Sequence, residues 1–194
     1  MLINFSLSPL TQTSAQDDER LARLAQTNPQ AFGQLYERHA DRIYSYCLAR
    51  TGAVEDAQDL TADIFLAALE NLERYDSRRS FTGWLYGIAH HKVVDHYRRR
   101  RPATSLEMAA EIPDPGCQTE DKAEEHIQMQ LVARAISTLG DDQAEALRLR
   151  IFAGLSAAET GAVMGKSEAA VKMLVHRALG NLQNRLAREI EVIL

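Results

Sequence analysis

Hydrophobic residues recur along most of the chain at helical spacing, and this pattern predicts an all-helical protein. Residues 1–16 are rich in Ser, Thr and Gln and show no clear apolar period, whereas helical signals begin at Asp17. Asn28 before Pro29 is typical of a helix N-cap with proline in the first turn, and Gly52 is typical of that helix's end. No stretch alternates as a β-strand does. We therefore interpret residues 1–16 as a mobile tail that precedes a helical protein.

Three amphipathic runs before residue 101 predict the faces that form a core. The inward positions of the first run are Phe32, Leu35, Tyr36, His39, Ile43, Tyr44, Cys47 and Leu48. Those of the second are Leu60, Ile64, Phe65, Ala68, Leu69 and Leu72, with Asp56, Asp59, Asp63 and Glu70 mostly outward. A polar loop follows, and the third run packs Trp84, Leu85, Ile88 and Ala89 before four consecutive arginines at 98–101. We expect one helical domain over residues 17–101.

Residues 102–125 interrupt the helical pattern. They contain three prolines and one glycine, and seven acidic residues against a single lysine. A segment of this composition and length is typical of a flexible linker rather than of a loop within a domain. Because helical periodicity resumes over residues 126–194, the sequence predicts an all-α fold of two small helical domains joined by a flexible acidic linker.

The second domain carries the strongest local motif, a helix-turn-helix near residues 155–182. Ser156 and Glu159 have the spacing of a capping box, and Ser167 can cap the second helix. Gly165 stands where the chain must turn sharply, and Gly161 is small enough for a close helix crossing. The second helix then has a continuous apolar stripe of Val171, Leu174, Val175, Ala178, Leu179 and Leu182.

The opposite side of this second helix is a candidate DNA-reading surface. It holds Ser167, Ala169, Lys172, Met173, His176 and Arg177. Lys172 and Arg177 are suited to base or phosphate contacts, and Met173 can touch a thymine methyl group. Ser167 and the free N–H groups at the helix start can hold a phosphate. A helical hairpin with an ordinary solvated face has the same pattern, so the motif alone leaves both interpretations open.

Charge and composition limit the possible partners and location. The net charge of −5 does not exclude DNA, because the acidic excess lies in residues 102–125, but it argues against tight, indiscriminate DNA binding. Cys47 and Cys117 are too few for a disulfide framework, which favours a reducing cytoplasm. No apolar run approaches the ~20 residues of a membrane span, and the first residues lack the features of a signal peptide.

Two sets of motifs together resemble the extracytoplasmic-function (ECF) class of bacterial sigma factors. Residues 139–182 resemble sigma region 4 through Leu-x-x-x-Gln-x-x-x-Leu-x-Leu-Arg, Gly154-Leu155-Ser156, Glu159 and His176-Arg177-Ala178-Leu179. Two other stretches resemble sigma region 2. The first is Asp56-Ala57-Gln58-Asp59-Leu60-Thr61-Ala62-Asp63 with Phe65. The second is Trp84-Leu85-x-x-Ile88-Ala89 with Asp95 and Arg98-Arg99-Arg100. The resemblance implies a transcription initiation factor that binds core RNA polymerase, directs it to promoters and assists their opening.

The resemblance also implies a role for each surface. Region 4 would read the −35 element with the six residues given above and touch the flap of the polymerase β subunit. The β′ coiled coil would be bound through Asp56, Asp59, Ala62 and Asp63. The single-stranded −10 element would be bound by Arg78, Arg79, Ser80, Phe81, Trp84, His91, Lys92, Tyr97, Arg98 and Arg99. Taken singly, Phe81 and Trp84 fit core positions better than base stacking. An anti-sigma protein that clamps both domains is a further partner known for the class.

Two other functions are compatible with parts of the sequence. An ordinary helix-turn-helix regulator would share the C-terminal half and bind its operator without polymerase, but it leaves the region 2 motifs unexplained. A metal hydrolase would use His91 and Asp95, which lie at i, i+4 on one helix face, but no third ligand is evident. We therefore expect no catalysis, no metal and no cofactor, in a bacterial cytoplasmic protein that is nucleoid-associated when bound to polymerase.

Overall fold

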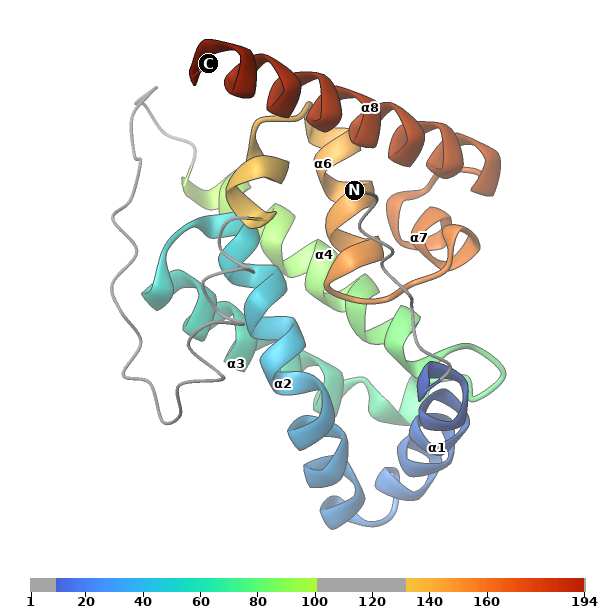
Figure 1. Cartoon of the computed structure of the whole chain (residues 1–194). Coiled ribbons are helices and arrows are strands. Elements are labelled where there is room, and N and C mark those ends of the chain that lie inside the picture. The colour runs from blue at the N-terminus through green and yellow to red at the C-terminus, as the bar shows by residue number, and fades with distance from the viewer. Residues whose placement is uncertain (1–9, 101–131, 194) are drawn as a thin grey trace.

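The computed structural model describes residues 10–100 and 132–193, and the side chains of residues 17–99 and 132–185, as helices joined by short turns (Figure 1). No strand occurs in these two ranges, so the predicted all-α fold is confirmed. The first unit contains α1 (Leu10–Ala25), α2 (Pro29–Thr51), α3 (Val54–Glu70), the 3₁₀ turn η1 (Leu72–Arg74) and α4 (Phe81–Arg100). The second unit contains a helical segment at 132–137, then α6 (Asp141–Ile151), α7 (Ala157–Met164) and α8 (Glu168–Ile193). The predicted linker, residues 102–125, lies outside the described residues.

Helix α1 begins at Leu10, so the predicted tail of residues 1–16 extends too far and the predicted start at Asp17 is too late. A contact with α2 anchors α1 directly after this segment. The buried Asp18 carboxylate accepts hydrogen bonds from Arg38 at 2.9 Å and lies 2.8 Å from His39 Nε2. The pattern of α1 alone could not show this contact, because the partners of Asp18 lie on α2.

The ends of α2 are those the sequence predicts. The Asn28 side chain accepts a hydrogen bond from the N–H of Gln30 at 3.0 Å, with Pro29 as the first helical residue. Gly52 has φ 69°, in the left-handed region that favours glycine, and its N–H bonds the Leu48 carbonyl at 2.9 Å. These local signals fix where α2 starts and stops, and therefore which side chains it presents to α3 and α4.

Helix α2 is central to the first unit and packs against α1, α3 and α4. Most predicted inward positions are buried or half-buried, but Tyr36 and Leu69 are exposed, contrary to the predicted stripes. Tyr36 still touches Phe65 with ring centroids 4.7 Å apart, so it covers the edge of the core rather than entering it. The apolar stripes are thus wider than the surface that the neighbouring helices cover.

In the second unit α8 packs against both α6 and α7. Val171 and Ala178 are buried, and Leu174, Val175 and Leu182 are half-buried, as the stripe predicts. Leu179 is exposed, which corrects its predicted inward position. It lies at the edge of the stripe, beyond the reach of α6 and α7.

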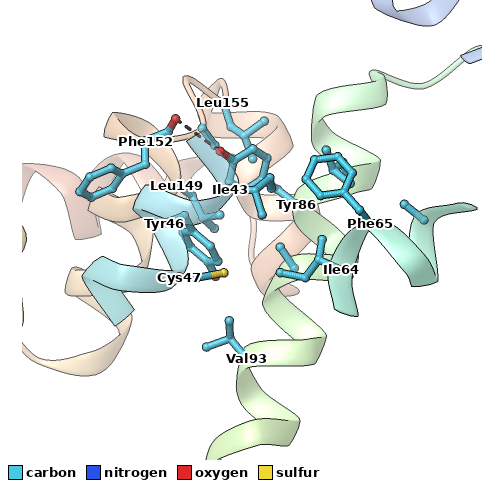
Figure 2. Packing of buried hydrophobic residues seen from close by; sticks show 14 of the residues in the cluster. Ile43, Tyr46, Cys47, Ile64, Phe65, Tyr86, Val93, Leu149, Phe152 and Leu155 are labelled. Carbon is cyan, nitrogen blue, oxygen red and sulfur yellow. Dashed lines mark hydrogen bonds between the residues drawn. The ribbon is translucent and has the colours of Figure 1, made fainter. Parts of the chain in front are cut away.

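The two units pack directly on each other. Helix α4 contacts α7, and α2 contacts α6, so one hydrophobic core runs through both units. Figure 2 shows Tyr46 and Tyr86 of the first unit beside Leu149, Phe152 and Leu155 of the second. The Tyr86 hydroxyl donates to the Phe152 carbonyl at 3.4 Å. The two helical units share an interface, and this interface lies beside a candidate binding site.

Candidate nucleic-acid interface

The turn of the helix-turn-helix has the geometry that its sequence predicts. The Ser156 hydroxyl accepts a hydrogen bond from the Glu159 N–H at 3.2 Å, and the Glu159 carboxylate accepts one from the Ser156 N–H at 2.8 Å. This reciprocal capping box fixes the start of α7. At its end Gly165 has φ 64° and ψ 32°, a left-handed conformation that turns the chain toward α8.

Gly161 lets the chain after α7 return close to its own helix. A Cβ atom at this position would lie 2.6 Å from the backbone carbonyl oxygen of Lys166, a distance that real Cβ atoms do not show. Ser167 then caps α8 by accepting a hydrogen bond from the Ala170 N–H at 3.2 Å. The predicted functions of Gly161 and Ser167 in the turn are confirmed.

The recognition face of α8, defined here as the six residues that the sequence predicts for −35 DNA, is exposed. It comprises Ser167, Ala169, Lys172, Met173, His176 and Arg177. Lys172 Nζ lies 2.6 Å from a Glu168 carboxylate oxygen, an exposed pair on one side of the helix. Arg177 makes no ion pair with another described residue. The face therefore offers a partner two cations, Lys172 and Arg177, and the exposed thioether of Met173. Of the two cations, Arg177 has no competing carboxylate among the described residues.

A second candidate surface is a cleft of about 920 Å³ between α4 and α7, which we call the α4 cleft. Five residues of the predicted −10 set line it, namely Arg79, Ser80, Trp84, His91 and Lys92. Other lining residues of the first unit are Asn71, Arg74, Gly83, Gly87, Ile88 and Asp95. An aromatic wall beside several cations is the combination that binds single-stranded nucleic acid.

The remaining members of the predicted −10 set lie outside the α4 cleft. Arg78 turns back on Asp76 with two nitrogens, at 3.0 and 2.9 Å, and these hydrogen bonds hold the pKa of Asp76 at about 2. Arg98 lies 3.2 Å from Asp95, and Arg99 is exposed farther along α4. Tyr97 donates its hydroxyl to the Arg50 carbonyl, with the Arg50 guanidinium 5.6 Å from its ring centre. Arg78 and Arg79 are thus adjacent in sequence, but Arg79 lines the α4 cleft whereas Arg78 is paired with Asp76 outside it.

Phe81 is a core residue, so its predicted contact with −10 DNA is wrong. Its side chain is only 1% exposed, and its ring packs against those of Tyr75, Trp84 and His39, with centroids 5.5 to 5.7 Å apart. An amphipathic pattern cannot separate an aromatic residue that lines a cleft from one that lies beneath it. Phe81 supports Trp84, which remains half-buried at the cleft wall.

The predicted polymerase-binding residues lie on α3. Asp59, Ala62 and Asp63 are exposed, whereas Asp56 is half-buried with a carboxylate oxygen 3.7 Å from His96 Nε2. Leu66, which is 56% exposed, lies on the same helix and is not among the predicted residues. Its spacing from Asp59 and Asp63 by seven and three residues places it on the same side of the helix, and this spacing is the signal that identifies it.

Neither a metal site nor a membrane span is found in the described part of the chain. Among these residues no group of His, Cys, Asp and Glu side chains could hold a metal ion. His91 Nδ1 instead lies 2.7 Å from the Gly87 carbonyl of its own helix. No described helix is both long and apolar enough to cross a bilayer.

Comparison with known proteins identifies both units. Residues 35–103 match the family described as Sigma-70 region 2, and residues 129–182 match Sigma-70 region 4. The chain is 35% identical to the ECF RNA polymerase sigma factor BldN of Streptomyces coelicolor, over 89% of this chain and 67% of that protein. It is 34% identical to the ECF sigma factor SigF of Caulobacter vibrioides, over 76% and 80% respectively. The chain belongs to the ECF class of RNA polymerase sigma factors.

Solved structures agree with this assignment. The structure of CnrH in complex with the cytosolic domain of CnrY has a TM-score of 0.68 and 28% identity, over 88% of this chain and 97% of that one. CnrH of Cupriavidus metallidurans is an RNA polymerase sigma factor. The predicted class and function are confirmed: the protein is a sigma factor, which directs core polymerase to promoters in transcription initiation. Such factors are DNA-binding initiation proteins rather than conventional enzymes.

Proposed function

We propose that this sigma factor divides promoter recognition between its two candidate DNA surfaces and binds polymerase with a third. The recognition face of α8 reads the −35 element as duplex, the α4 cleft holds the −10 element as a single strand, and the exposed side of α3 docks on the polymerase. The observation that carries the proposal is the exposure of all six residues of the recognition face beyond a correctly capped turn.

The composition of the recognition face supports duplex reading. A helix whose N-terminal half carries Lys172, Met173 and Arg177 on one exposed side can enter a major groove. Arg177 is the best candidate for a specific contact, since a bidentate guanidinium pairs with guanine and no described carboxylate competes for it. Lys172 must leave Glu168 before it can contact DNA.

The lining of the α4 cleft supports single-strand binding. Trp84 supplies a ring on which a base can stack, and Arg79 and Lys92 supply positive charge for the phosphates. His91 offers a polar edge at the same wall. The recognition face thus binds duplex DNA and the α4 cleft binds single-stranded DNA, and promoter opening requires both.

The exposed side of α3 supports protein docking. Asp59 and Asp63 give the negative charge that steers association with a basic partner, and Leu66 adds apolar area beside them. We further propose that residues 102–125 tether the two units, that the protein acts in the cytoplasm, and that a protein partner regulates it, as the complex of CnrH with CnrY suggests by analogy.

Reconstitution with core polymerase and a pool of promoter fragments tests the proposal. We expect initiation from a selected subset of fragments and weak duplex binding by the sigma factor alone. Tight, specific duplex binding without polymerase, together with no initiation, would favour the ordinary regulator instead.

Two variants separate the surfaces. Arg177→Ala should weaken −35 duplex binding in the holoenzyme by about 1–3 kcal/mol if the contact is bidentate, whereas Arg134→Ala removes an exposed cation elsewhere in the second unit and should not. Asp63→Arg should lower affinity for core polymerase, and Asp41→Arg, an exposed acid on α2, is its control. If Arg177→Ala and Asp63→Arg failed only in the same assay, the division of roles would be wrong.

A further inference from the structure

Tyr75 is a buried residue that contacts two residues of the α4 cleft. Its side chain is 5% exposed, and the centroid of its ring lies 5.1 Å from that of Trp84. Its hydroxyl donates a hydrogen bond to the carbonyl oxygen of Arg79 at 2.6 Å. Burial raises the pKa of Tyr75 to about 12, so the hydroxyl keeps its proton and can donate at neutral pH. One buried side chain therefore connects the aromatic wall of the cleft to one of its cations.

The Tyr75 hydroxyl fixes the loop of residues 75–80, which joins η1 to α4. Within the loop the Arg79 N–H donates to the Asp76 carbonyl at 2.9 Å, and the Asp76 carboxylate accepts a hydrogen bond from the Arg78 N–H at 3.1 Å. These two bonds form the turn, but they join residues of the turn to each other and do not tie it to the core. The hydroxyl of Tyr75 does, because the ring that carries it belongs to the core.

The loop sends two consecutive arginines in different directions. The Arg78 guanidinium turns back on the Asp76 carboxylate, with Nη2 at 2.9 Å, whereas the Arg79 side chain lines the α4 cleft. The peptide bond between Arg79 and Ser80 is planar, so a hydrogen bond that holds the Arg79 carbonyl also holds this whole peptide unit. The Tyr75 hydroxyl therefore restricts the backbone from which the Arg79 side chain extends.

We propose that Tyr75 is a positioning residue for recognition of the −10 strand, and that its hydroxyl holds the 75–80 loop in the shape that presents Arg79 to the α4 cleft beside Trp84. The inference rests on the proposed −10 function of that cleft. A guanidinium that is placed before DNA arrives loses less conformational freedom when it binds a phosphate, so an ordered loop strengthens binding. The Tyr75 hydroxyl acts through Arg79 and does not touch DNA.

Hydrogen exchange of the full chain tests the hold on the loop without DNA. Tyr75→Phe keeps the buried ring and removes only the hydroxyl, so amide exchange over residues 76–80 should become about two- to tenfold faster, as the loss of one hydrogen bond implies. Exchange within α3 should not change. Tyr44→Phe removes a half-buried hydroxyl from α2, outside the cleft, and is the matched control. Quenched-flow labelling and mass spectrometry give the rates, and equal loop rates in Tyr75→Phe and the unaltered protein would overturn the proposal.

A double-mutant cycle tests whether the ordered loop serves Arg79. The full chain is titrated against a fluorescein-labelled, random-sequence single-stranded DNA 20-mer at low salt, and Tyr75→Phe should weaken binding about two- to tenfold. Arg79→Ala should weaken binding less in the Tyr75→Phe background than in the unaltered protein. Lys92→Ala should have the same effect in both backgrounds, since Lys92 lines the cleft from α4 rather than from the loop. Independent effects of Tyr75→Phe and Arg79→Ala, or equal coupling of Tyr75 to Arg79 and Lys92, would contradict the proposed role.

Trp84 gives a separate readout, because it is the only tryptophan in the chain. Saturating 20-mer should quench its fluorescence equally in the unaltered and Tyr75→Phe proteins, since a phenylalanine ring retains the packing against Trp84. Quenching lost in Tyr75→Phe would show that the substitution disturbs the aromatic wall, against the proposal. If the unaltered protein neither binds the 20-mer nor shows quenching, the proposed function of the cleft is wrong and the role of Tyr75 falls with it. Binding and quenching that Tyr75→Phe leaves unchanged would exclude the role of Tyr75 alone.

Discussion

The recognition face of α8 and the α4 cleft are both candidate DNA surfaces, but they differ in what covers them. The recognition face is exposed, and the second unit alone forms it. The cleft takes one wall from each unit, and Glu159 of the second unit lies in it beside Gly83 of the first. Access to the recognition face therefore depends on the fold of one unit, whereas access to the cleft depends on how the two units are arranged.

The largest effect is expected where the recognition face depends on the turn. Gly161→Ala places a Cβ against the Lys166 carbonyl, a backbone atom that cannot swing away, and should destabilise the protein by about 3 kcal/mol, at the upper end for overpacking. Gly180→Ala on α8 meets nothing within 4 Å and should instead stabilise by about 0.5–1 kcal/mol, as expected for a helix interior. Thermal unfolding of both variants measures the difference. A Gly161→Ala protein as stable as Gly180→Ala would contradict the close approach.

A smaller effect is expected within the cleft. Trp84→Ala should weaken single-stranded −10 DNA binding by about 1–3 kcal/mol, since it removes the stacking ring. Arg79→Ala should weaken the same binding and reduce its salt dependence, while Arg78→Ala should have little effect because Arg78 is held by Asp76 outside the cleft. Fluorescence anisotropy with the promoter's −10 strand gives the three affinities. Equal losses of affinity for Arg78→Ala and Arg79→Ala would show that the cleft does not bind the −10 strand.

Acid should open the interface before it disrupts the recognition face. The pKa of Glu145 is lowered from its usual 4.5, so the stability that this carboxylate contributes is present above that pH and is lost as pH falls through the depressed value. Tyr46, Arg50, His90 and Arg148 all face the carboxylate, so its neutralisation leaves these groups without their anionic partner. Scattering from pH 7 to 3 should show expansion that Glu145→Gln already shows at pH 7. Identical titrations for both proteins would exclude Glu145 as the responsible group.

The smallest effect is expected at Lys172. Its exposed pair with Glu168 contributes at most about 1 kcal/mol, and DNA must break it, so Lys172→Ala should weaken −35 binding less than Arg177→Ala does. Glu168→Gln should slightly strengthen binding because it frees Lys172 and removes a negative charge. The −35 duplex affinities of the holoenzymes with these three variants test this order of effects. A larger loss of affinity for Lys172→Ala than for Arg177→Ala would contradict it.

The sequence was most informative where structure is local. The caps at Asn28 and Ser156 and the turn at Gly165 depend on residues within four positions, and all three were predicted. The exposed recognition face followed from subtracting the apolar stripe, although Leu179 at its edge was placed wrongly. Sequence motifs also identified the family, because two sets of residues occur in one order along the chain.

The contacts between units could not be predicted in the same way. Tyr46 and Glu145 are 99 positions apart, and nothing in the helical period of α2 or α6 indicates that they meet. The sequence pattern places His90 in neither candidate site, and in the structure its side chain contacts Glu145. Phe81 was assigned to DNA because aromatic residues near arginines suit base stacking, yet packing against Tyr75 and His39 buries it. Burial is decided by which helices meet, and one helix's pattern does not contain that information.

The long separation between Tyr46 and Glu145 also has a consequence during synthesis. Domains fold as units from the N-terminus while the ribosome adds about 5–20 residues per second, so His90 emerges roughly 3–11 seconds before Glu145. Through this interval the nascent first unit lacks the carboxylate that Tyr46, Arg50 and His90 bind in the finished chain. The growing polypeptide therefore passes through a stage in which these three side chains have no partner from the second unit, because that half of the protein does not yet exist.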